Sequence, residues 1–97
     1  MSRSIHRSAS DELVEAFRFY KREAGAGIAS RFLAEFERVA RVLEQHPDIG
    51  TATADGRKAH PLTEFPYSII YRNDDFGLRI LVVRHQSRDP NYGESRR

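Results

Sequence analysis

The side chains best suited to chemistry are concentrated in residues 84–92 of this 97-residue chain. The stretch contains Arg84, His85, Arg88 and Tyr92. A guanidinium binds phosphate or carboxylate through two parallel hydrogen bonds, and a histidine transfers protons near neutral pH. A tyrosine can stack on a nucleobase or donate a proton through its hydroxyl. These groups would suffice for metal-free RNA cleavage, which needs a base, an acid and cations for the charge that develops on the phosphate.

Three further cations, Arg57, Lys58 and Arg72, lie in segments that we predict to be strands. Together with the first group they form a candidate functional face of Arg57, Lys58, Arg72, Arg84, His85, Arg88 and Tyr92. Each residue also has a structural interpretation. His85 at a strand end can serve as a hydrogen-bonding residue, and Arg57 with Lys58 can be solubilising charge beside a loop. The sequence leaves both interpretations open.

The net charge of +2 is confined to the second half of the chain. Residues 1–54 carry eight basic and eight acidic side chains, whereas residues 55–97 carry eight basic and six acidic ones. The excess is small for a protein that binds nucleic acid along its whole surface. A clustered set of arginines can still form a local anion site.

Several classes of function are disfavoured by what the sequence lacks. There is no cysteine, so disulfides and thiolate zinc sites are excluded. The four histidines are scattered and no glycine-rich phosphate loop is present, so we expect neither metal nor cofactor. No apolar run approaches the ~18 residues of a membrane span. We therefore expect a cytoplasmic protein without a membrane partner.

The first half of the chain predicts an edge strand followed by two helices. The short segment 2–8 alternates weakly, as edge strands do. Ser8 or Ser10 is a candidate N-cap for a first helix, with Asp11 and Glu12 in its first turn. The glycine-rich segment 25–27 ends this helix, and a second helix with apolar residues at offsets of three and four continues to Pro47. The short link predicts an antiparallel helical hairpin.

After a polar, mobile loop at 51–56 the apolar period changes from 3.6 to 2, which predicts strands at 57–62, 65–72 and 78–85. The last is apolar on both faces, as in a central strand, with Leu78, Ile80 and Val82 on one side. The order β-α-α-β-β-β predicts an α+β fold, with the helical hairpin packed on a small twisted antiparallel sheet. We expect one domain over residues 1–97, with the tail after residue 85 lying over it.

The order and spacing of these pieces resemble the RelE/ParE toxin superfamily of bacterial type II toxin–antitoxin modules, in its plasmid-stabilisation branch. The resemblance covers about residues 4–92. It is carried by Phe19-Tyr20, by Ala29, Phe32, Leu33, Phe36 and Leu43, by Pro47 and Gly50, by Arg57-Lys58, by Phe65-Pro66-Tyr67 with Ile70-Tyr71, and by Ile80-Leu81-Val82-Val83 with His85, Arg88-Asp89-Pro90 and Tyr92.

The resemblance implies an antitoxin partner that neutralises the chain and one of two targets. RelE-like members cut mRNA on the ribosome without metal, using basic residues on the sheet and often a C-terminal tyrosine. ParE-like members inhibit DNA gyrase. Because only two cations occupy the segment at 57–58, we favour the gyrase target over an endoribonuclease, with an inactive antitoxin-binding domain as the third possibility. Gly93 stands where this branch usually has tryptophan.

Overall fold

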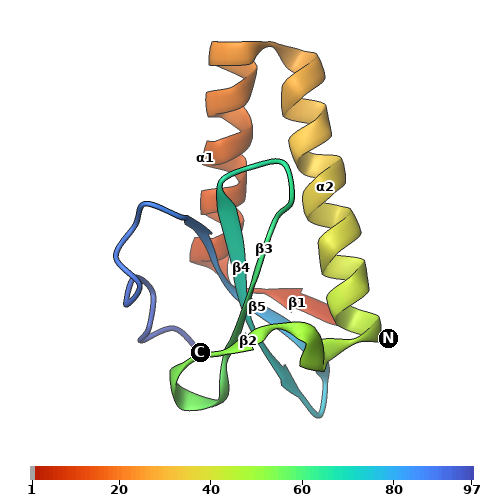
Figure 1. The fold of residues 1–97 in the computed structure, drawn as a ribbon, viewed down its shortest axis with the longest axis vertical. Helices are drawn as coiled ribbons and strands as arrows, with labels where there is room; N and C mark the ends of the chain where they lie inside the picture. The colour runs from red at the N-terminus through yellow and green to blue at the C-terminus, as the bar shows by residue number, and fades with distance from the viewer. Residues whose placement is uncertain (1) are drawn as a thin grey trace.

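The structure is a computed structural model that describes residues 2–97, and it confirms the predicted α+β fold (Figure 1). In chain order the elements are β1 (Arg3–Ile5), α1 (Arg7–Ala24), α2 (Ala26–Gln45), a 3-10 turn (Pro47–Ile49), β2 (Thr51–Ala52), a second 3-10 turn (Ala54–Gly56), β3 (Lys58–Pro61), β4 (Tyr67–Asp74) and β5 (Gly77–His85). They form one five-stranded sheet in the order β1-β5-β4-β3-β2. The short β2 lies in the segment that the sequence predicted to be a loop.

The sheet is antiparallel except at one edge, where β1 runs parallel to β5. The expectation of a wholly antiparallel sheet was wrong at this strand. The helical hairpin returns the chain to the sheet, and the reversals from β3 to β4 and from β4 to β5 leave β5 in the direction of β1 (Figure 1). The pairing is short, because it joins only Arg3 with Leu78, Ser4 with Arg79 and Ile5 with Ile80.

Helix α1 begins earlier than the serine caps predicted. His6 is the N-cap, and its Nδ1 accepts a hydrogen bond of 3.0 Å from the Ser8 amide. Asp11 and Glu12 therefore lie beyond the first turn, and the side chain of Glu12 is free to reach the sheet. At its other end α1 stops at Gly25, whose φ of 94° is a conformation that glycine adopts without strain.

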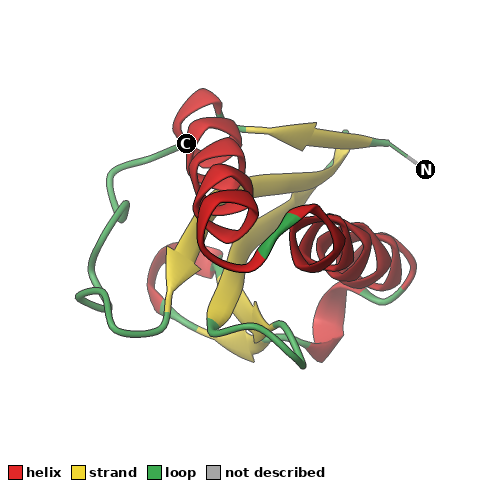
Figure 2. Ribbon diagram, turned by 90° about the horizontal axis from the view of Figure 1, so that it is seen from above, coloured by secondary structure: helices red, strands yellow, loops and turns green. Residues whose placement is uncertain are grey.

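Both helices cover the same face of the sheet (Figure 2). The buried core lies between them and β4–β5, and Phe32 of α2 is at its centre with no exposed surface. The centre of its ring lies 5.2–5.4 Å from the ring centres of Tyr20, Phe65 and Tyr67. A second, smaller cluster of Ile70, Leu81 and Val82 lies apart from it and is packed against Tyr92 of the tail.

A bulge in β5 changes which side chains share a face. Ile70 pairs with Val82 but Tyr71 pairs with Ile80, so Leu81 is an extra residue in β5. As a result Leu81 and Val82 both belong to the second cluster, whereas Val83 returns to the main core with Ile80. The predicted grouping of Val82 with Ile80 was therefore wrong, since strict alternation cannot anticipate a bulge.

Candidate functional site

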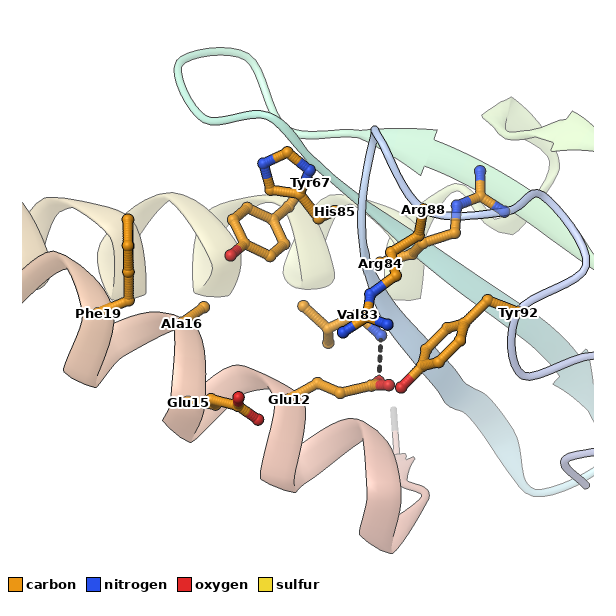
Figure 3. A pocket seen from close by; sticks show the side chains of 10 residues that line it. All are labelled: Glu12, Glu15, Ala16, Phe19, Tyr67, Val83, Arg84, His85, Arg88 and Tyr92. Atoms are coloured by element: carbon orange, nitrogen blue, oxygen red, sulfur yellow. Dashed lines mark hydrogen bonds between the residues drawn. The ribbon is translucent and has the colours of Figure 1, made fainter.

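A shallow pocket of about 170 Å³ lies between α1, the end of β5 and the C-terminal tail (Figure 3). Four of the predicted site residues line it: Arg84, His85, Arg88 and Tyr92. The opposite wall comes from α1, which contributes Glu12, Glu15, Ala16 and Phe19. The pocket thus brings together arginines from one side and carboxylates from the other, with aromatic rings between them.

His85 is engaged in local structure. Its ring meets the Tyr67 ring edge-on at a centroid distance of 5.0 Å. Its Nδ1 accepts a hydrogen bond of 3.1 Å from the Ser87 amide. A ring nitrogen that accepts an amide N–H carries no proton, so the neutral imidazole has its proton on Nε2. These contacts fit the structural interpretation of this histidine.

Tyr92 is held between two cations. The guanidinium carbons of Arg88 and Arg96 lie 4.8 Å and 5.1 Å from the centre of its ring. Such cation–π contacts favour a fixed ring orientation. The ring also packs on the second apolar cluster. Tyr92 therefore anchors the tail to the sheet as well as lining the pocket.

The strongest polar contact of the site is an ion pair that the sequence analysis missed. Arg96 binds both carboxylate oxygens of Glu12 at 2.8 Å, and both side chains are largely buried, with 13% and 14% exposed. The partners are 84 residues apart, so no local pattern signals the pair. Arg96 also donates to the Leu81 carbonyl at 3.0 Å. Glu12 in turn accepts a hydrogen bond of 3.1 Å from the Val83 amide (Figure 3).

These contacts hold Glu12 in its ionised form. Burial alone would raise the pKa of its carboxyl, but hydrogen bonds from Arg96, Tyr92 and the Val83 amide outweigh it and leave the pKa below 4.5. The mutual hydrogen bonds also raise the pKa of Arg96. The pair is therefore fully charged at neutral pH.

A pH dependence of stability follows from the lowered pKa of Glu12. The stabilisation is fully present above the ordinary pKa of the unfolded chain, near 4.5, and is lost as pH falls through the lower pKa of the folded state. Glu12→Gln should therefore lose stability relative to wild type at pH 7, and the difference should shrink below about pH 4. Urea unfolding from pH 3 to pH 7 measures this, and a difference independent of pH would contradict it. Glu15→Gln is the control.

Arg57 does not reach this pocket. It is 6% exposed, and its guanidinium donates to the carbonyl of Gly93 at 3.1 Å and to those of Glu94 and Arg96. Burial, and then the nearby charge of Arg97, lower the pKa of Arg57. Its three acceptors are backbone groups of the tail, so Arg57 fixes the tail to β3.

Gly93 allows the C-terminal tail to pack closely against Val82 of β5. Its φ is 78°, and a Cβ at this position would lie 2.7 Å from Cγ2 of Val82. A tryptophan here would need both another backbone conformation and another path for the tail. The tail can therefore pack on β5 along this path only because residue 93 is glycine.

The remaining two predicted cations lie apart from the pocket. Lys58 pairs with Tyr71 in the β3–β4 ladder, and Arg72 is opposite Arg79, with its Nε 3.7 Å from Asp74. Arg84 points toward the tail, where it donates to the Pro90 carbonyl at 3.1 Å. The structure thus gathers four of the seven candidates in this pocket, and a second pocket joins Arg57, which holds the tail, to Arg84 and Tyr92. Lys58 and Arg72 line neither pocket.

Among residues 2–97, no group of three histidine or acidic side chains is placed to hold a metal ion. No helix in this part of the chain is long and apolar enough to cross a membrane.

Comparison with known proteins gives a family from the sequence and the same fold from a solved structure. Residues 4–90 match the family model described as ParE toxin of type II toxin–antitoxin system, parDE. The chain is 29% identical over 91 residues to Toxin ParE2 of Mycobacterium tuberculosis, in strains CDC 1551 / Oshkosh and H37Rv, covering 94% of this chain and 87% of the relative. A solved structure described as the chromosomal ParDE TA system from P. aeruginosa has the same fold, with a TM-score of 0.77 and 20% identity over 88% of this chain and 95% of that one.

Proposed function

The chain belongs to the ParE toxin family of type II toxin–antitoxin systems, and on that premise we propose that it arrests growth by inhibiting DNA gyrase. A cognate antitoxin, made from the same module, would neutralise it by binding. The target enzyme acts on chromosomal DNA, so the site of action is the cytoplasm.

The choice of target rests on what the Arg57 guanidinium binds. RNA cleavage without metal needs several cations around one phosphate, together with a base and an acid. Here the Arg57 guanidinium is occupied by backbone carbonyls of the tail, and Lys58 and Arg72 lie away from Arg84 and Arg88. His85 is occupied by Ser87 and Tyr67. A second pocket does bring Arg57 to Arg84 and Tyr92, but the tail carbonyls occupy the Arg57 guanidinium there. The occupied Arg57 and His85 support inhibition by binding over cleavage.

The test is to induce the chain without its antitoxin in a bacterial host. We expect growth to stop, with SOS induction and trapped gyrase–DNA adducts, and we expect the purified chain to inhibit supercoiling by gyrase. Co-expression of the antitoxin should restore growth. Codon-phased mRNA cuts on translating ribosomes, with intact gyrase activity, would instead assign the nuclease function. Harmless accumulation of soluble chain would indicate an inactive antitoxin-binding domain.

A further inference from the structure

The turn between β4 and β5 presents one aromatic side chain almost wholly to solvent. Phe76 is 87% exposed, whereas the other exposed large apolar side chains among residues 2–97 are at most 49% exposed. The turn lies at the end of the molecule opposite the link between α1 and α2 (Figure 1). A ring that stays in water gains no free energy from burial, so the stability of the fold does not explain its presence here.

The backbone that carries this ring is held from both sides. The Phe76 amide donates to Oδ1 of Asp74 at 2.9 Å, and the Ser2 hydroxyl donates to the Phe76 carbonyl. The Leu78 amide in turn donates to the Ser2 carbonyl at 3.1 Å. Gly77 has a φ of 114°, and a Cβ at this position would clash with the Ser2 carbonyl. The ring is therefore presented on a preorganised backbone, which lowers the entropy that binding costs.

An acidic groove lies beside the exposed ring. It has a volume of about 370 Å³ and runs between the turn and the C-terminal end of α2. The described residues that line it include the carboxylates of Glu44, Asp74 and Asp75 and no cation. Arg3 binds Glu44 at 2.9 Å from outside the groove, and Nε of Arg72 lies 3.7 Å from Asp74. Asp75 is exposed next to the ring, so its carboxylate is the one best placed to meet a basic partner.

We propose that the hairpin tip, residues 74–77, is the surface by which the toxin binds gyrase. Phe76 enters an apolar recess of the enzyme, and Asp75 meets basic side chains at its border. The inference rests on the gyrase target of the preceding subsection. An enzyme that binds DNA has basic surfaces for the phosphates, so an acidic tip on a chain with a net charge of +2 is complementary to it. Buried aromatic anchors inside a polar rim supply much of the binding energy of protein interfaces.

The hairpin tip is separate from the pocket between α1 and the tail, because the two share no lining residue. Substitutions at the tip therefore leave the Glu12–Arg96 ion pair and the attachment of the tail in place. Phe76→Ala removes a ring that the fold does not bury, so its Tm should equal that of wild type. Any loss of activity in this variant then reports on binding and not on folding.

The first experiment measures inhibition of gyrase supercoiling by the purified full-length chain. We expect Phe76→Ala to raise the concentration for half inhibition at least tenfold, because an interface loses its aromatic anchor. Leu33→Ala is the matched control, since Leu33 is also an exposed apolar residue but lies on α2 about three turns from Glu44. It should stay within about twofold of wild type. Equal inhibition by wild type and Phe76→Ala would overturn the inference and leave the gyrase target intact, whereas a wild-type chain that does not inhibit gyrase would overturn both.

A charge reversal at the tip tests the partner's chemistry. Asp75→Lys should weaken binding of the full-length chain to purified gyrase at least tenfold at low salt, because like charges then face each other. The difference from wild type should shrink as salt is raised, since exposed charges are screened. Glu23→Lys is the matched control, because it makes the same change on an exposed side chain at the other end of the molecule.

Three further results would overturn the proposal. Equal weakening by Asp75→Lys and Glu23→Lys would show that only the overall charge of the chain matters. Loss of antitoxin binding in Phe76→Ala, with unchanged gyrase inhibition, would assign the hairpin tip to the antitoxin. Dimers of the wild-type chain in sedimentation that Phe76→Ala abolishes, again with unchanged inhibition, would assign the tip to a second copy of the chain.

Discussion

Replacing Arg57 by alanine is expected to lower the free energy of unfolding by about 2–3 kcal/mol and to release the C-terminal tail. The side chain is buried and donates to three tail carbonyls, which lose a charged donor in the variant. Hydrogen bonds to charged groups contribute about 1.5–3 kcal/mol, and buried acceptors without a partner add a cost. Urea unfolding measures the first effect, and the rate of trypsin cleavage after Arg88 measures the second.

Lys58→Ala is the matched control for this prediction, because it removes a neighbouring cation that makes no hydrogen bond to the tail. It should change the unfolding free energy by less than about 0.5 kcal/mol, as surface substitutions usually do. Equal stability and equal tail cleavage in the two variants would show that the tail does not depend on Arg57. Arg57 would then not be occupied by the tail, and the main support for a binding activity over cleavage would be lost.

The second large effect is expected in the core. Phe32→Ala should lower the unfolding free energy by about 3–5 kcal/mol, because it removes a fully buried ring and leaves a cavity. The loss is larger than the apolar area alone suggests, since Tyr20, Phe65 and Tyr67 each lose an aromatic neighbour. Thermal unfolding of a domain of this size should show a fall in Tm of more than about 12 °C.

Leu33→Ala, one residue further along α2, is the control for the core. Leu33 is 36% exposed and lies outside the main cluster, so the change should cost at most about 1 kcal/mol. If the two substitutions cost the same, the assignment of Phe32 to the centre of the core would be wrong. Both variants retain the Glu12–Arg96 ion pair and Arg57, so any difference between them reports on packing alone.

The sequence was sufficient for the elements that depend on local periodicity. Apolar residues at helical spacing predicted α2 with its buried face of Phe32, Phe36, Val39, Ala40 and Leu43. Alternation predicted β4, with Tyr67, Ile69 and Tyr71 on the core side. The change from period 3.6 to period 2 then determined the fold class, because helices and strands segregated along the chain make an α+β domain.

Other local features were predicted less well, for a physical reason in each case. The N-cap is His6 and not a serine, because an imidazole nitrogen can accept the Ser8 amide as a serine hydroxyl would. The bulge at Leu81 left no trace in a segment that is apolar on both faces. The parallel direction of β1 depends on where the helical hairpin returns the chain to the sheet. The weak alternation of the three residues in β1 carries no information about that direction.

The site divides in the same way. The sequence by itself showed that the chemically useful side chains are close together in residues 84–92. In the structure, four residues of this stretch line one pocket: Arg84, His85, Arg88 and Tyr92. Only the tertiary structure decided that Arg57 holds the tail and that Glu12 meets Arg96 beside β5. Those contacts join residues 36 and 84 positions apart. Hydrogen bonds of this range are fixed by how β3, α1 and the tail pack together, and periodicity carries no information about them.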